Sequence, residues 1–130
     1  MNVPENLKYT KTHEWVRVDK ETITVGITDF AQHQLSELTF VELPDPGQEV
    51  AEKDEVAVVE SVKAASDVYA PVDGVITSVN EELATKPDLI NNDPYGAGWI
   101  FKMKVEKASD LDVLLDAESY EELLPKGPES

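Results

Sequence analysis

Short β-prone runs dominate this chain, and at residues 56–72 apolar positions recur at every second residue, which is the pattern of β-strands that bury one face. Two β-prone runs, Thr12 to Val18 and Thr22 to Ile27, are joined at Asp19-Lys20-Glu21 and predict a hairpin. Further strands are predicted at residues 39–43, 75–79 and 99–105. We therefore expect a mainly β fold.

Helical spacing interrupts this pattern in two places. Asp29 can cap a helix, and Ala31, Leu35 and Leu38 follow it at helical intervals, which predicts a short helix. Leucines recur at the same spacing through residues 109–124, with acids on the other faces, and predict two short C-terminal helices that pack on the sheet. We also expect one helical turn at 80–83, a loop at 87–98 and a frayed tail at 125–130.

One lysine, Lys63, stands alone between two valine-rich strand candidates. Apolar positions on both sides of it keep the spacing of residues that share one sheet face; they are Val56, Val58 and Val62 before it and Val68, Ala70 and Val72 after it. The small residues at 64–66 suit the turn between the strands. This pattern presents a primary amine at a hairpin tip, where another enzyme can modify it. A solvated turn lysine without such a role is the ordinary alternative.

Length and charge restrict the classes of function. With 130 residues, the chain is expected to form a single domain, 1–130, with a core at about 8–106 followed by the C-terminal helices. The net charge of −16, from 27 acidic and 11 basic residues, makes nucleic acid and anionic membrane surfaces poor partners and basic protein surfaces better ones. Solubility alone would also account for this acidity.

Other features of the sequence bear on cellular location. No apolar stretch approaches the ~20 residues of a membrane span, and the first residues lack the basic and apolar regions of a signal peptide. We expect a cytoplasmic protein with no membrane partner, although a mature mitochondrial protein given a new methionine would look the same. The chain has no cysteine, which excludes disulfides, thiolate metal sites and cysteine nucleophiles.

Conventional catalytic motifs are missing from the sequence. His13-Glu14 begins like the helical motif of zinc proteases, but no second histidine follows four residues later and the pair lies in a strand pattern. His33 is predicted on the polar side of its helix, and two histidines offer little to a histidine-based site. No nucleophile elbow and no phosphate-binding glycine loop is present. We therefore expect neither an enzyme nor a metal site, and Lys63 remains as the feature that can carry chemistry.

The surroundings of Lys63, with Ala70-Pro71-Val72-Asp73-Gly74 after it, resemble the swinging-arm domains that carry lipoate or biotin in amide linkage. Biotin acceptors typically flank the lysine with methionine on both sides, whereas Val62 and Ala64 flank it here, which favours lipoate. Lipoyl domains also tend to place an acid three residues before the lysine, a glycine sixteen before and a glycine eleven after. Glu60, Gly47 and Gly74 match these offsets.

This resemblance implies both a fold and a site. It implies a lipoyl-domain-like barrel-sandwich hybrid of two small antiparallel sheets. It also implies that Lys63 is the lipoyl attachment residue, and that Glu60, Gly47 and Gly74 take part in recognition by a lipoate-attaching enzyme.

Among lipoyl carriers, the chain resembles the glycine cleavage system H-protein family over nearly its whole length. The runs that carry this resemblance are Tyr9-Thr10-Lys11-Thr12-His13-Glu14-Trp15-Val16, Val25-Gly26-Ile27-Thr28, Phe40-Val41-Glu42-Leu43-Pro44, Glu60-Ser61-Val62-Lys63-Ala64 and Asn92-Asp93-Pro94-Tyr95-Gly96 with Gly98-Trp99. Lipoyl domains of 2-oxo-acid dehydrogenases favour Asp before the lysine instead. One departure from the family is Ser36-Glu37, where Gly-Asp is usual, and it affects a helix end.

The family resemblance implies a carrier rather than an enzyme. Lipoate on Lys63 would take an aminomethyl group from a pyridoxal-phosphate glycine decarboxylase to a tetrahydrofolate-dependent aminomethyltransferase, and dihydrolipoamide dehydrogenase would reoxidise the arm. We expect a monomer. A lipoyl carrier that serves another pathway, such as lipoate relay to other proteins, would share every feature of the hairpin.

The loaded arm is expected to fold against a surface cleft that protects it from water, and an acid is needed to hold its ammonium. We expect Glu14 and Asp67 in this role, with His33 as a possible neighbour. Solvated surface acids without any such role are the alternative for these positions.

Overall fold

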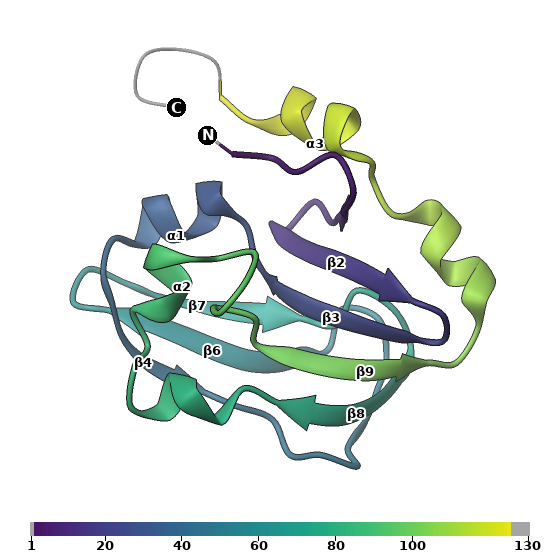
Figure 1. Ribbon diagram of the computed structural model, residues 1–130, viewed down its shortest axis with the longest axis horizontal. Helices are drawn as coiled ribbons and strands as arrows, with labels where there is room; N and C mark the ends of the chain where they lie inside the picture. Colours follow the sequence, from purple (N-terminus) through teal and green to yellow (C-terminus); the bar gives the residue numbers. More distant parts are fainter. Residues whose placement is uncertain (1, 126–130) are drawn as a thin grey trace.

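The computed structural model describes residues 2–125, which fold into two antiparallel β-sheets with short helices along their edges (Figure 1). The larger sheet has the strand order β1-β2-β3-β9-β8-β5, and the smaller has the order β4-β6-β7. The strands are β1 Lys8–Tyr9, β2 Glu14–Asp19, β3 Thr22–Ile27, β4 Leu38–Glu42, β5 Glu49–Val50, β6 Glu55–Ser61, β7 Ala65–Tyr69, β8 Gly74–Val79 and β9 Phe101–Val105. The helices are α1 Asp29–Leu35, α2 Leu89–Asn92 and α3 Ala117–Leu123, with 3₁₀ helices at Glu81–Ala84 and Ala108–Val113. The predicted mainly β fold of two antiparallel sheets is confirmed.

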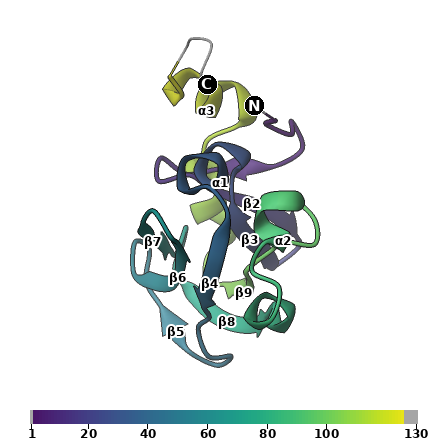
Figure 2. The same cartoon turned by 90° about the vertical axis from the view of Figure 1, so that its left-hand side faces the viewer.

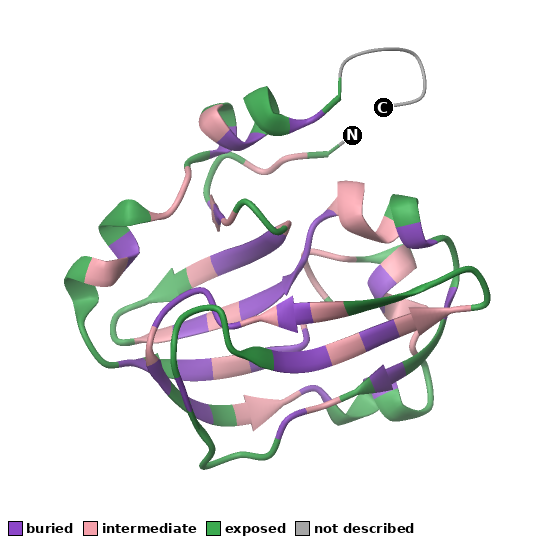
Figure 3. Ribbon diagram, turned by 180° about the vertical axis from the view of Figure 1, so that it is seen from behind, coloured by how far each residue is buried: buried purple, intermediate pink, exposed green. Residues whose placement is uncertain are grey.

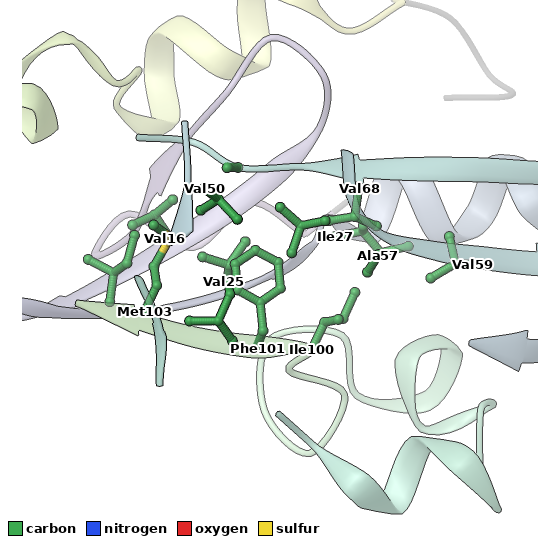
Figure 4. Close-up of a cluster of buried hydrophobic side chains, with 14 of the residues drawn as sticks. Val16, Val25, Ile27, Val50, Ala57, Val59, Val68, Ile100, Phe101 and Met103 are labelled. Carbon is green, nitrogen blue, oxygen red and sulfur yellow. The ribbon is translucent and has the colours of Figure 1, made fainter. Parts of the chain in front are cut away.

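The two sheets lie face to face, as the side view in Figure 2 shows. Figure 4 shows apolar side chains from both sheets pointing toward one another in the space between them. They include Val16, Val25, Phe101 and Met103 from the larger sheet and Ala57, Val59 and Val68 from the smaller one, none more than 3% exposed. Full burial of a large apolar side chain stabilises a fold by about 1.5–3 kcal/mol. The alternating pattern in the sequence is therefore the pattern of residues that face this core.

A second, smaller core lies on the other face of β2, beneath α3 and the N-terminal segment (Figure 1). Its buried members are Leu7, Tyr9, Trp15, Ala117, Tyr120 and Leu124. Gly26 lies opposite Trp15 on β3, and a Cβ there would meet the indole ring at 2.7 Å, so only glycine fits. The predicted pair of C-terminal helices is confirmed, although the first of them is a 3₁₀ helix.

Two further expectations concern the C-terminal tail and membrane-spanning helices. Apart from Pro125, the tail predicted at 125–130 lies outside the described residues. Within residues 2–125, no helix is both long enough and apolar enough to cross a membrane.

Helix α1 begins and ends differently from the prediction. Thr28, not Asp29, is the N-cap, because its side chain accepts a hydrogen bond from the amide of Ala31. The helix ends at Leu35, and Leu38 belongs to β4. At the end of the helix, Ser36 has φ +68° and ψ −161°, a conformation that is largely restricted to glycine. The helix stops here because the chain leaves helical geometry at this residue.

The apolar face predicted around Lys63 is correct after the lysine and for Val56 before it, but wrong for Val58 and Val62. Val68, Ala70 and Val72 are buried as expected. On β6, however, a shift of register between Glu55 and Ala57 turns Ala57 and Val59 toward the core and leaves Val58 only half-buried. Val62 lies beyond the last paired residue and is 94% exposed.

The segment predicted as a loop at 87–98 contains a helix, α2, and its Ile90 is fully buried. The 80–83 turn is confirmed as a 3₁₀ helix at Glu81–Ala84. Asn80 stands at the start of that turn, where its side-chain amide donates to the carbonyl oxygens of Ala97 and Trp99, both at 2.8 Å. This buried amide ties the end of β8 to the connection between α2 and β9.

Candidate functional site

Lys63 stands at the tip of the hairpin that joins β6 and β7. The Ser61 amide donates to the Ala64 carbonyl at 2.8 Å, which leaves only Val62 and Lys63 as the loop. Residues 62–66 are all exposed, and they form the green tip that projects from the sheet in Figure 3. The structure therefore places the lysine where the sequence predicted it.

The Ser61 side chain organises this tip. Its Oγ accepts hydrogen bonds from the amides of Lys63 at 3.2 Å and Ala64 at 3.1 Å. Neither Val62 nor Lys63 has a positive φ, so the β-branched Val62 is tolerated without strain. The loop is therefore not one of the positive-φ turns that require glycine, and the Ser61 hydroxyl binds its amides instead.

The Lys63 ammonium lies near the end of α1. Its Nζ donates to the Gln34 carbonyl at 3.2 Å, where the partial negative charge of a helix C-terminus favours a cation. The residue is exposed, so an enzyme that approaches the tip can reach the amine.

Glu60 lies close to the lysine, whereas the two matching glycines do not share its sheet. Glu60 is half-buried near the end of β6, opposite Phe40 and Ala65. Gly47 has φ +92° in the turn before β5, and its amide donates to a carbonyl of β8 at 2.7 Å. Gly74 begins β8, where a Cβ would lie 2.2 Å from the Lys104 carbonyl oxygen. Both glycines are therefore explained by the backbone around the larger sheet: Gly47 by its positive φ, and Gly74 by the close approach of the Lys104 carbonyl.

A cleft of about 410 Å³ opens beside the start of β2. Four separate segments line it: Tyr9 to Thr12 with Glu14, Glu52 with Lys53, Tyr69 to Pro71, and Val113 to Leu115. Glu14 is the acid that the sequence predicted for such a cleft. It is 1% exposed, so the alternative of a solvated surface acid is wrong for this residue.

The Glu14 carboxylate is held by three donors. Oε1 accepts from the hydroxyls of Thr10 and Thr12, and Oε2 accepts from the Tyr69 amide at 3.3 Å. Burial raises the pKa of Glu14, and these hydrogen bonds oppose that rise. No lysine or arginine in the described part of the chain forms an ion pair with it, so a cation that entered the cleft would relieve the cost of burying its charge.

Asp67 and His33 lie in different places. Asp67 is half-buried on β7, opposite Val58 and two residues before the Tyr69 amide that binds Glu14. His33 is exposed on α1 beside a different hollow, which Ser36 and Asn91 help to line. The structure thus brings Glu14 to the strand that carries Asp67 and does not bring His33 to the cleft.

Sequence reasoning missed the other groups around Glu14. Thr10 and Thr12 alternate with it along the chain, and this spacing of two hydroxyls before an acid was an available signal. Tyr69 and the Val113–Leu115 segment join the cleft only through the tertiary fold, so no local pattern could have revealed them.

Comparison with known proteins assigns this chain to a family. Residues 7–127 match the family model described as glycine cleavage H-protein. The chain belongs to this family. The glycine cleavage system H protein of Citrobacter koseri is 56% identical over 124 residues, covering 95% of this chain and 96% of that protein. The glycine cleavage system H protein of Thermus thermophilus is 54% identical over 124 residues, covering 95% of this chain and 97% of that protein.

A solved structure agrees with the fold. The crystal structure of a glycine cleavage system H protein from Mycobacterium marinum matches with a TM-score of 0.84 and 35% identity, covering 91% of this chain and 95% of that chain. The predicted lipoyl-domain-like barrel-sandwich fold is therefore confirmed. H proteins are carrier components and not catalytic enzymes, which confirms that expectation as well.

Proposed function

We propose that this chain is the lipoyl carrier of a glycine cleavage system, with lipoate in amide linkage to Nζ of Lys63. The observation that carries the proposal is the exposed lysine on a two-residue hairpin tip in a member of the H-protein family. The lipoyl dithiolane supplies a strained disulfide that opens to accept the aminomethyl cargo and is closed again by oxidation. The residues present fit this group, because the amine is accessible and a cleft with a buried carboxylate lies along the same hairpin strand.

The protein's own residues present the lysine to other enzymes, receive the loaded arm and shield it from water. Ser61 fixes the tip through the Lys63 and Ala64 amides, so the attachment point is ordered. Glu60 lies beside the tip and is proposed to contact the lipoate-attaching enzyme. Gly47 and Gly74 contribute indirectly to that recognition by shaping the sheet against which the hairpin sheet packs.

The cleft is proposed to shelter the loaded arm between encounters. The Glu14 carboxylate accepts a hydrogen bond from the ammonium of the cargo, and this ion pair provides a partner for its buried charge. Asp67, on the strand between Lys63 and the cleft, adds a second carboxylate along the way. Because His33 lies beside a different hollow, it is left out of this proposal.

The partners proposed for the carrier are a pyridoxal-phosphate glycine decarboxylase, a tetrahydrofolate-dependent aminomethyltransferase, dihydrolipoamide dehydrogenase and a lipoate-attaching enzyme. The chain is proposed to act as one domain and as a monomer in the cytoplasm. A monomer suits a carrier that offers its hairpin to several enzymes in turn.

Intact mass and reconstitution test the proposal. After incubation with lipoate and a lipoate-attaching enzyme, the full chain should gain one lipoyl group, and peptide mapping should place it on Lys63. The modified chain should then support glycine decarboxylation with the partner enzymes. A modified chain that fails in reconstitution would indicate a lipoyl carrier of another pathway, and an unmodified chain would contradict the proposal altogether.

A further inference from the structure

Glu14 owes its position to the tight turn between β1 and β2, residues 10–14. The Thr10 amide donates to the Glu14 carbonyl at 3.0 Å, and Thr10 Oγ1 accepts from the Glu14 amide at 3.1 Å. Inside the turn, His13 has φ +74°, a left-handed conformation that costs a residue with a Cβ about 1–3 kcal/mol. Such a conformation persists only where surrounding groups hold it. Within the turn, the His13 amide donates to the Thr10 carbonyl at 3.2 Å.

Tyr120 of α3 supplies a further contact from outside the turn. Its hydroxyl lies 2.8 Å from His13 Nδ1 and 2.7 Å from Thr28 Oγ1, and its side chain is fully buried. The phenol ring stacks on Tyr9 with centroids 4.7 Å apart and meets the imidazole edge-on at 5.7 Å. The Thr28 amide also donates to the His13 carbonyl at 3.0 Å. His13 is therefore held by its ring through Tyr120 and by its backbone through Thr28.

The segment that carries Tyr120 also builds one wall of the cleft. Tyr9 and Leu115 exchange two backbone hydrogen bonds of 2.8 Å each, which places residues 113–115 against the pocket that Glu14 faces. Asp116 then caps α3 by accepting from the Ser119 amide at 2.8 Å. The wall and the contact to His13 thus belong to one continuous C-terminal unit.

We infer that Tyr120 is a positioning residue for Glu14: through His13 it holds the 10–14 turn so that the Glu14 carboxylate faces the cleft. Tyr120 is not among the residues that line the cleft, so it does not itself contact the arm. This inference rests on the proposed role of the cleft in sheltering the loaded arm.

The test compares Tyr120→Phe with Tyr95→Phe in the full chain. Each substitution removes one tyrosine hydroxyl that makes two hydrogen bonds, since the Tyr95 hydroxyl accepts from the Asp29 amide at 2.9 Å and donates to the Asn2 carbonyl at 2.6 Å. The Tyr95 hydroxyl does not touch the 10–14 turn, so Tyr95→Phe is the matched control.

The first readout is amide hydrogen exchange at Glu14 and Tyr69, with Met103 in the main core as the internal reference. Loss of the hydrogen bond to His13 predicts exchange about five- to tenfold faster at Glu14 and Tyr69 in Tyr120→Phe, with Met103 unchanged. The second readout is ammonia release from the loaded carrier without partner enzymes, which should rise by a similar factor. Lipoylation of Lys63 should not change.

The outcomes separate this inference from the proposed function. Equal exchange at both amides in Tyr120→Phe and Tyr95→Phe overturns the inference. Faster exchange with unchanged ammonia release supports the positioning role and contradicts the proposed arm cleft instead.

A second variant covers the case in which Tyr120→Phe fails to fold. His13→Asn keeps a residue that tolerates the left-handed conformation and removes the imidazole that Tyr120 contacts. It should reproduce the faster exchange at Glu14 and Tyr69, and the double variant should add little to either single one. Normal exchange in His13→Asn, or fully additive effects of the two substitutions, would overturn the inference.

Discussion

Lys63 and Glu14, the two residues on which the proposed chemistry depends, differ in their exposure to water. Lys63 is exposed and reaches only a backbone carbonyl, so its amine can be acylated. Glu14 is 1% exposed, and its side-chain oxygens accept hydrogen bonds from hydroxyl and amide donors. Accessibility therefore determines what Lys63 can do, and desolvation determines what Glu14 can bind.

Replacement of Lys63 by arginine should abolish the carrier function. Lys63→Arg keeps the positive charge but has no amine that can form the lipoyl amide. Intact mass should show no lipoyl group, and glycine-dependent CO2 exchange should fall to the level that free lipoate supports. Lys86→Arg, at another exposed position, should behave as wild type.

Glu14 in the cleft and Asp67 on the strand that leads to it should both slow the loss of cargo. Glu14→Gln and Asp67→Asn should each release ammonia from the loaded carrier faster than wild type, because the cargo ammonium loses a carboxylate. Release is measured without partner enzymes, after circular dichroism has confirmed folding. Glu81→Gln, an exposed acid on a 3₁₀ helix, is the control. If both variants keep the cargo as long as wild type does, the cleft assignment fails.

Burial of Glu14 also predicts a dependence of stability on pH. The pKa of Glu14 is raised above its ordinary value of 4.5 by burial. The protonated form is thus favoured in the folded state, so this contribution is fully present below the ordinary pKa and is lost as pH rises through the raised pKa. Glu14→Gln cannot titrate.

Urea unfolding at about pH 4 and about pH 7 checks this prediction. From the lower pH to the higher, the free energy of unfolding of wild type should fall relative to that of Glu14→Gln. A constant difference between the two proteins would show that the pKa of Glu14 is not raised. Glu81→Gln serves again as the exposed control.

At the scale of a single element, the clearest backbone strain lies at the end of α1. Ser36 occupies a conformation that only glycine adopts easily, at a position where the sequence comparison expected glycine. Ser36→Gly should therefore stabilise the protein by about 1 kcal/mol, which urea unfolding measures. Ser66→Gly, on an exposed stretch of β7, should instead destabilise it by about 0.5–1 kcal/mol. A Ser36→Gly variant no more stable than wild type would show that the strain is relieved elsewhere.

The local sequence pattern predicted an element well wherever its two faces differ in polarity. The β2–β3 hairpin follows from two β-prone runs joined at a turn, and the two C-terminal helices follow from leucines at helical spacing. Alternation failed before Lys63, because a bulge in β6 exchanges the two faces and Val62 has no sheet above it. Helix α2 escaped notice because its single turn lies among residues typical of loops.

The residues of the candidate site also divide into those that the sequence could predict and those that it could not. Lys63 and Glu60 could be found from spacing within one hairpin. Glu14 could be named as a candidate from the sequence, but its burial could not be predicted. That burial depends on Tyr69 and on the C-terminal segment, which are distant in sequence. His33 was misplaced beside it because a helical pattern gives the exposed side of a helix but not what lies opposite.

At the scale of the whole molecule, a net charge of −16 predicts salt-sensitive encounters with partner enzymes. Long-range attraction to basic surfaces mainly raises the rate of association. Turnover of the carrier by the decarboxylase should therefore fall between low salt and ~0.5 M, where the Debye length is only a few ångströms. Equal turnover at both salt concentrations would exclude electrostatic steering. Free lipoamide, which lacks the protein's charge, is the control.

The ordered tip of the β6–β7 hairpin has a consequence for how the arm searches. Its loop is two residues long, contains no glycine and is fixed by Ser61, so the Cα of Lys63 should move little relative to the sheets. A tethered group then samples only the shell that its own rotatable bonds allow. A mobile loop of the same reach would spread the group over a larger volume and lower its local concentration at any docked enzyme. The hairpin thus leaves the swing of the arm to the lysine side chain and its lipoyl group alone.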